Sequence, residues 1–132
     1  TVIPQTSGTV HWAQRKDGPD GGQVVSIYSG NTLAFYVGIG SLTQPQAGGP
    51  DWFGSDSNLF IIQPYIVGNW DTVDAQFDTN AGMYRVSING GAYSTWKQLV
   101  NPVPSIDGIR IYRAPSGNNV GINYWDDIRF TN

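Results

Sequence analysis

The segment DTVDAQFDTNAGMYRVSINGG, residues 71–91, contains two runs in which apolar and polar residues alternate. The apolar positions are Val73, Ala75 and Phe77, followed by Tyr84, Val86 and Ile88. A period of two is the pattern of a strand with one buried and one solvated face. Residues 78–82 and 89–91 are rich in Asp, Asn and Gly, which favour turns. The segment therefore predicts antiparallel strands joined by short turns.

The same pattern continues on both sides of this segment. Strands are expected near residues 10–13, 23–28, 33–39, 59–66, 73–77, 84–88, 93–99, 109–112 and 122–130,. In Leu59–Ile66, apolar residues occupy both sets of alternating positions, which predicts a central strand covered on both sides. Ser41–Ser57 is the longest stretch without a strand pattern, and a loop of that length in a small domain favours a functional role.

The types of acidic residue indicate a β-protein more than a helical one. All 10 acidic residues are Asp and none is Glu, and Asp favours turns and caps where Glu favours helices. At 132 residues the chain is long enough for one domain with a real core,. We therefore expect a single domain over residues 1–132, an all-β antiparallel sandwich of two sheets with a jelly-roll, concanavalin A-like arrangement.

Charge, apolar runs and cysteine content limit the binding partners and the covalent cross-links that the chain can have. The net charge is −3 and the 7 Lys and Arg residues are scattered, so we expect no binding to nucleic acid,. No apolar run approaches the roughly 18 residues needed to cross a bilayer, so we expect no membrane insertion. Cysteine is absent, which excludes disulfides. A surface built from Ser, Thr, Asn, Gln and Gly predicts a secreted, extracellular domain that is monomeric in isolation.

The second half of the chain resembles known sugar-binding folds. The ending Gly121–Phe130, GINYWDDIRF, resembles the last strand of jelly-roll carbohydrate-binding modules. Residues 70–78 and 84–91 are similar to the middle strands of concanavalin A-like lectins and glucanases. The resemblance implies carbohydrate binding on a two-sheet sandwich.

A second resemblance involves the upstream strands. Residues 35–40 and 60–65 are similar to paired core strands of the fungal glutamic peptidases, also concanavalin A-like. The likeness would place Gln63 at that family's catalytic Gln. The partner Glu has no counterpart here, so the resemblance supports the fold and argues against peptidase activity.

The first candidate site is centred on Trp125. Proteins bind sugars with a flat aromatic ring and planar hydrogen-bonding groups. Simple alternation places Trp125 with Asn123, Asp127 and Arg129 on a polar outer face. The alternative is a Trp packed beneath a neighbouring segment.

Further ligand-binding candidates lie upstream. Tyr36, Gln63 and Tyr65 face outward together if Phe35 and Ile62 point into the core, the alternative being a covered sheet face. Trp52 lies in the expected long loop, either as a ligand contact or as a plug that pins the loop. Asp74, on the polar side of its strand, completes the predicted ligand-binding set.

The remaining aromatic and titratable residues favour structural roles. Trp12 is expected in the core, and Trp70 and Trp96 in core or edge packing. His11 is the only His, and no nucleophile motif accompanies it, so a structural role is expected. Asp74 and Asp78 share a strand face at a separation of roughly 13 Å, too far for a glycosidase carboxylate pair. We therefore assign no catalytic residue.

Calcium is the one cofactor that the sequence suggests. Asp17, Asp20 and either Asp126 or Asp127 offer the hard oxygen ligands that Ca²⁺ prefers,. An ordinary Asp-stabilised turn explains the same residues, and no metal ligand is assigned.

The sequence therefore predicts a non-catalytic module or lectin that binds a polysaccharide or oligosaccharide. Two alternatives remain, namely a small polysaccharide-degrading enzyme on the same scaffold and an adhesin or protein-interaction domain. Fold alone does not decide between them.

Overall fold

The computed structural model describes residues 4–17, 22–40, 50–56, 59–113 and 123–131, and within these ranges the chain is built of strands. The strands are β1 (Ser7–Lys16), β2 (Gln23–Ser29), β3 (Thr32–Gly40), β4 (Asp51–Ser55), β5 (Leu59–Pro64), β6 (Asp71–Asp78), β7 (Met83–Ile88), β8 (Lys97–Gln98), β9 (Gly108–Arg113) and β10 (Asn123–Thr131). The described residues include no helix that is long and apolar enough to cross a membrane.

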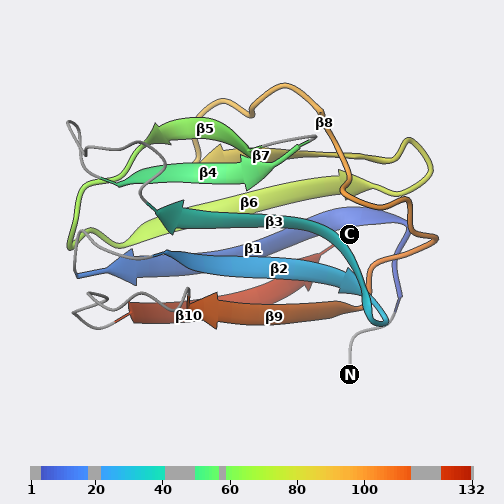
Figure 1. Ribbon diagram of the computed structural model, residues 1–132, viewed down its shortest axis with the longest axis horizontal. Coiled ribbons are helices and arrows are strands. Elements are labelled where there is room, and N and C mark those ends of the chain that lie inside the picture. The colour runs from blue at the N-terminus through green and yellow to red at the C-terminus, as the bar shows by residue number, and fades with distance from the viewer. Residues whose placement is uncertain (1–3, 18–21, 41–49, 57–58, 114–122, 132) are drawn as a thin grey trace.

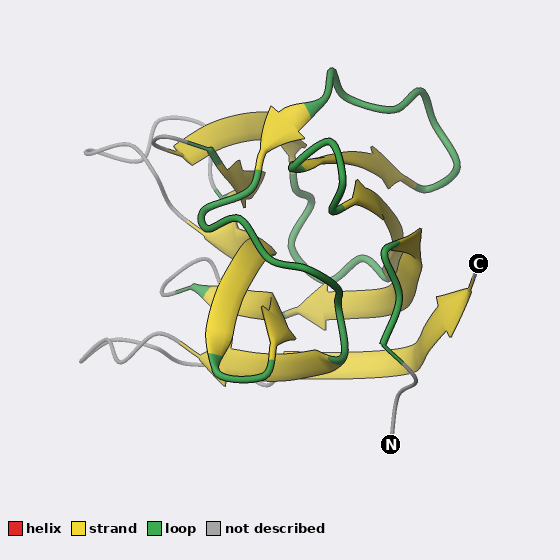
Figure 2. Cartoon of the chain, turned by 90° about the vertical axis from the view of Figure 1, so that its right-hand side faces the viewer, coloured by secondary structure: helices red, strands yellow, loops and turns green. Residues whose placement is uncertain are grey.

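The strands form two antiparallel sheets. One has the order β10-β1-β6-β7-β8 and the other the order β5-β4-β3-β2-β9. Figure 1 shows the two sheets stacked with their strands nearly aligned, β9 and β10 at the lower edge and β5 and β8 at the upper edge. Figure 2 shows the layers from one end. The predicted two-sheet antiparallel jelly-roll sandwich is confirmed.

Three local predictions are wrong. The expected irregular stretch Ser41–Ser57 contains β4, which pairs with both β3 and β5. The expected covered strand near Leu59–Ile66 is β5, an edge strand whose Leu59 and Ile61 are exposed. The strand expected over residues 93–99 is only Lys97–Gln98. Apolar composition indicated a strand correctly in β5 but did not indicate its position within the sheet.

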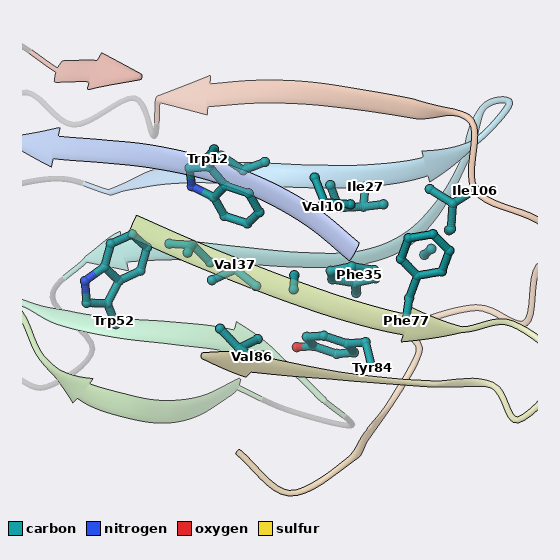
Figure 3. Close-up of a cluster of buried hydrophobic side chains, with 14 of the residues drawn as sticks. Val10, Trp12, Ile27, Phe35, Val37, Trp52, Phe77, Tyr84, Val86 and Ile106 are labelled. Carbon is teal, nitrogen blue, oxygen red and sulfur yellow. The ribbon is translucent and has the colours of Figure 1, made fainter. Parts of the chain in front are cut away.

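Aromatic rings fill the space between the sheets (Figure 3). Phe35 of β3 stacks on Tyr84 of β7 with ring centroids 4.2 Å apart and an interplanar angle of 15°. The Tyr84 hydroxyl donates to the carbonyl oxygen of Ser55 in β4. A stacked aromatic pair stabilises the folded state by about 1 kcal/mol beyond the contribution of the surface area that it buries. Trp12 is fully buried in the same core, as predicted.

The segment from Leu99 to Asp107 crosses from one sheet to the other at one end of the molecule (Figure 1). Its backbone bonds to both sheets, since Leu99 N–H donates to the Gly82 carbonyl in the turn between β6 and β7, and Val100 N–H donates to the Ala34 carbonyl of β3. Leu99, Val103 and Ile106 are buried. This crossing segment therefore closes the open end of the core with apolar side chains.

Polar side chains also lie inside the sandwich, and most are paired. Trp52 Nε1 donates to Asp71 Oδ2 at 2.8 Å. Trp12 Nε1 donates to Gln14 Oε1 at 2.9 Å, and the Gln14 amide donates to the Gln23 carbonyl at 3.3 Å. The Gln23 side chain itself is fully buried, and neither of its amide atoms has a hydrogen-bond partner in the described part of the chain. Burial of an unpaired amide costs stability, whereas burial of a paired one does not.

These two glutamines predict opposite effects of the same substitution. Gln23→Met removes an unpaired amide at nearly constant volume, so the free energy of unfolding should rise by about 1 kcal/mol. Gln14→Met leaves the Trp12 indole N–H without an acceptor, so the free energy of unfolding should fall by about 1–3 kcal/mol. Urea unfolding of both variants measures this. A Gln23→Met variant destabilised as much as Gln14→Met would contradict the difference in pairing.

Candidate functional site

The outer face of the sheet containing β1, β6 and β7 carries polar residues in register. His11 of β1 lies opposite Asp74 of β6, and Thr9 lies opposite Gln76. Gln76 lies in turn opposite Arg85 of β7. Their neighbours in sequence, such as Val10, Ala75 and Val86, are buried in the core. The alternation of each strand therefore presents a row of polar side chains on a rigid surface.

Two exposed aromatic rings hold an arginine at one side of this face. The Arg85 guanidinium carbon lies 4.5 Å from the Tyr93 ring centroid and 4.6 Å from that of Trp96. Arg85 Nε donates to Gln76 Oε1 at 2.6 Å. Tyr93 and Trp96 remain 39% and 42% exposed. We call Gln76, Arg85, Tyr93 and Trp96 the aromatic–arginine cluster.

The segment that carries both rings is fixed to β7. Ser94 N–H donates to the Val86 carbonyl at 2.8 Å, and the Ser94 hydroxyl accepts from Val86 N–H at 3.1 Å. In Figure 1 this segment, between β7 and β8, follows the upper edge of the molecule. The segment that carries the rings is therefore held to β7 by two hydrogen bonds between Ser94 and Val86.

A groove of about 660 Å³ adjoins the cluster. Its walls are the chain from Pro4 to Thr9 and the Trp96 side chain, with Gln76 and Asp78 between them. An exposed indole beside amide, carboxylate and hydroxyl groups is the combination that binds a sugar ring on its face and its edge.

His11 connects the charged residues further along the same face. Its Nδ1 lies 2.7 Å from Asp74 Oδ1 and its Nε2 lies 3.4 Å from Asp127 Oδ2. Arg129 Nη2 lies 3.7 Å from the same Asp127 oxygen. Asp74, a predicted ligand-binding residue, is therefore on the outer face, where it anchors His11. Its role toward a ligand stays a prediction.

The predicted orientation of Trp125 is wrong, and a bulge in β10 is the reason. His11 pairs with Arg129 but Ala13 pairs with Asp126, so two residues of β10 face one residue of β1. Asp127, one of the two, has φ of 53°. The extra residue reverses the alternation. Trp125 and Phe130 consequently both pack against the core, while Arg129 faces outward.

Two other predicted aromatic residues are buried and present no surface to a ligand. Trp52 is fully buried, its indole N–H bonded to Asp71. Tyr65 is 4% exposed, and its hydroxyl donates to the Asn69 carbonyl at 2.6 Å and accepts from Lys16 N–H at 2.8 Å. Burial raises the Tyr65 pKa above its ordinary value. Trp52 is therefore a core residue of β4, and neither the predicted ligand contact nor the predicted loop plug describes it.

The remaining predicted residues do not form one site. Tyr36 is half-buried on the outer face of the other sheet, its ring edge-on to Phe53 at 6.3 Å. Gln63 is exposed and lines a small cleft of about 270 Å³ between β5 and residues 92–97. The side chain of Asn123 lies outside the described residues. The predicted set of Tyr36, Gln63 and Tyr65 is thus dispersed.

A second group of exposed rings lies near the start of β6. Trp70 is 47% exposed and lies 5.9 Å from Tyr124, centroid to centroid. The neighbouring Ile66 and Val67 are exposed and apolar. Arg15, over the Tyr124 ring at 5.1 Å, is already bonded to Asp17 at 2.7 Å. This group therefore offers ring surface but fewer free hydrogen-bonding groups than the aromatic–arginine cluster.

The calcium site predicted from Asp17, Asp20 and either Asp126 or Asp127 stays a prediction. Asp17 is bonded to Arg15, and Asp20 lies outside the described residues. Asp126 Oδ1 accepts from the Asp127 N–H. Within the described ranges, no three His, Cys, Asp or Glu residues are grouped so as to hold a metal ion.

Sequence reasoning missed Trp96 and Arg85 as site residues. Trp96 was expected in packing, yet its neighbours Ser94, Thr95 and Lys97 are all polar, which is the signal of an exposed ring. Arg85 follows from alternation alone, since Tyr84 and Val86 on either side are buried. Their proximity depends on the turn after β7, whose path no sequence pattern specified.

Comparison with known proteins defines the fold. No protein-family model matches the chain, and no curated protein matches its sequence. A tetrameric galectin from the ball sponge Cinachyrella sp. is similar in structure, with a TM-score of 0.67, 13% identity and coverage of 99% of this chain and 96% of the galectin. A homodimeric agglutinin from chicken liver gives 0.63 at 13% identity, with coverage of 99% and 96%.

A sialidase matches with a TM-score of 0.68 at 15% identity over 98% of this chain, which spans 13% of the sialidase. At these low sequence identities, the TM-scores establish a shared fold. The chain is therefore a jelly-roll sandwich of the type seen in galectins, and its particular family within that fold is not identified.

The exposure of the five Trp residues predicts their response to a quencher. Trp70 and Trp96 are the exposed indoles, whereas Trp12 and Trp52 are fully buried and Trp125 packs against the core. The double variant Trp70→Phe/Trp96→Phe should emit at shorter wavelength and lose most acrylamide quenching. Unchanged quenching in this variant would contradict the buried positions of the other three.

The bulge predicts a selective requirement at position 127. Positive φ is tolerated by Asp and Asn but is strained for a β-branched residue. Asp127→Val should lower the free energy of unfolding by about 1–2 kcal/mol, whereas Asp127→Asn should change it by less than about 0.5 kcal/mol. Urea unfolding compares the two, and equal stability of both variants would argue against the positive φ.

Proposed function

We propose that this protein is a non-catalytic glycan-binding domain whose site is the aromatic–arginine cluster with its adjoining groove. The observation that carries the proposal is the exposed Trp96 ring beside Gln76 and Arg85. A pyranose has an apolar face that packs on an indole and hydroxyls that bond to amide and guanidinium groups.

The rigidity of the cluster supports this assignment. Gln76 and Arg85 lie on neighbouring strands, and Ser94 bonds the ring-bearing segment to β7. A preformed surface binds with less loss of conformational entropy than a flexible loop. His11 and Asp74 extend the polar face for a longer oligosaccharide.

The structural neighbours of the chain agree with this proposal. Two of them are a galectin and an agglutinin. We propose the same class of ligand for this chain, and an exported location in which it would meet polysaccharides.

The proposed absence of catalysis rests on the carboxylates beside the groove. Asp74 is bonded to His11, and Asp78 Oδ1 accepts the N–H groups of Asn80 and Ala81 at 3.0 and 3.2 Å. Both carboxylates therefore act as hydrogen-bond acceptors within the fold.

Affinity electrophoresis and fluorescence titration with a panel of polysaccharides test the proposal. Trp96→Ala should weaken binding by at least about tenfold, because it removes the stacking surface. Trp70→Ala is the matched control, since it removes an equally exposed Trp at a distant group, and should change binding by less than about twofold. Thermal melting of both variants verifies that they are folded.

Other outcomes would contradict the proposal in distinct ways. Loss of binding in Trp70→Ala but not in Trp96→Ala would move the site to the Trp70–Tyr124 group. Release of new reducing ends from the same panel would favour an enzyme. Failure of every polysaccharide to bind would remove the proposed function.

A further inference from the structure

We propose that the aromatic–arginine cluster selects glycans that carry a negative charge, as a carboxylate or a sulfate, and that Arg85 is the residue that selects them. This inference rests on the proposed function and specifies its ligand class. It depends on three observations about Arg85, namely its pairing, its neighbours and its fixed position.

Arg85 lacks a counter-ion within the described part of the chain. Its one hydrogen bond there runs from Nε to the neutral amide oxygen of Gln76, and no ion pair involves it. The two Nη groups are therefore free to donate to a ligand. A guanidinium presents these donors in a planar fork that matches a carboxylate or sulfate oxygen pair.

The nearby carboxylates are already engaged. Asp74 and Asp78 flank Gln76 on the outer face of β6. Asp74 bonds to His11 at 2.7 Å, and Asp78 accepts two backbone N–H groups of the following turn. Arg129 and Arg15, the other arginines on the outer side of this sheet, lie 3.7 Å from Asp127 and 2.7 Å from Asp17. Arg85 is therefore the cation on this face that an external anion can neutralise.

The rings hold the guanidinium in place before a ligand arrives. Tyr93 and Trp96 each lie within 4.6 Å of the Arg85 guanidinium carbon, and Nε is bonded to Gln76. Contact with an aromatic face restricts the side chain and shields it partly from water, which strengthens its interaction with an anion. The same Trp96 adjoins the groove, so a sugar ring there would bring an acidic substituent to Arg85.

Paired polysaccharides that differ only in charge test the inference. One pair is polygalacturonate and its methyl ester, which isolates the carboxylate, and the other is a sulfated galactan and its desulfated form, which isolates the sulfate. The wild-type protein should bind the charged member of at least one pair about tenfold more tightly. Raising the salt concentration should reduce this preference and leave neutral binding unchanged.

Arg85→Gln should abolish the preference, so that the charged and neutral members of a pair bind with equal affinity, whatever affinity for the neutral polymer remains after the loss of the guanidinium donors. Arg85→Lys should keep part of the preference, because the charge remains but the planar fork is lost. The matched control is Arg110→Gln. Arg110 also lies over a ring, 4.1 Å from that of Tyr28, and donates to Asn31, but on the other sheet. The Arg110→Gln variant changes the net charge by the same amount as Arg85→Gln and should leave the preference intact.

Three results would overturn the inference. Equal binding of both members in both pairs would leave the glycan site standing but without charge selection. An equal loss in Arg85→Gln and Arg110→Gln would show attraction to the overall charge of the protein instead of to one residue. Absence of binding to all four polymers would remove the proposed function itself, together with this selectivity.

Discussion

The stack of Phe35 on Tyr84 joins the two sheets, and the positions of many other residues depend on it. The two rings come from β3 and β7, and the Tyr84 hydroxyl also bonds to Ser55 in β4. The contact requires Gly54, since a Cβ at that position would lie 2.8 Å from the Tyr84 oxygen and 2.7 Å from the Phe60 ring. Because Tyr84 points inward, the next residue, Arg85, must point outward. The proposed site is thus a direct consequence of core packing.

The outer face differs from the core in how its charges are arranged. His11, Asp74, Asp127 and Arg129 contact one another across three strands, whereas Arg85 is paired with rings and an amide. A chain with only 13% charged residues has few groups available for such an arrangement. Among the arginines on the outer side of this sheet, Arg85 is consequently the one without a carboxylate partner in the described part of the chain.

The fold could be predicted from the sequence because each strand of the sandwich exposes one side and buries the other, which produces the alternation at Val73–Phe77 and Tyr84–Ile88. The same rule failed at Trp125, because one extra residue at Asp127 shifts the alternation without altering composition. It failed differently at Trp52, which was expected in a loop but lies in β4, and at Tyr65, which was expected to face outward with Gln63. The polar atoms of both side chains are hydrogen-bonded inside the fold. The aromatic–arginine cluster joins β6, β7 and the segment after β7, and contacts of that kind leave no periodic signal in the sequence.

The bulge at Asp127 also affects how the molecule meets copies of itself. β10 is the outermost strand of its sheet, and a straight outermost strand offers unpaired N–H and C=O groups to which another chain can add. An irregular strand with exposed Asp126, Asp127 and Arg129 is a poor template for such addition, because the spacing of its backbone groups is broken and charged side chains line the edge,. The residue that turns Trp125 into the core thereby also protects the domain against fibrous association through this border.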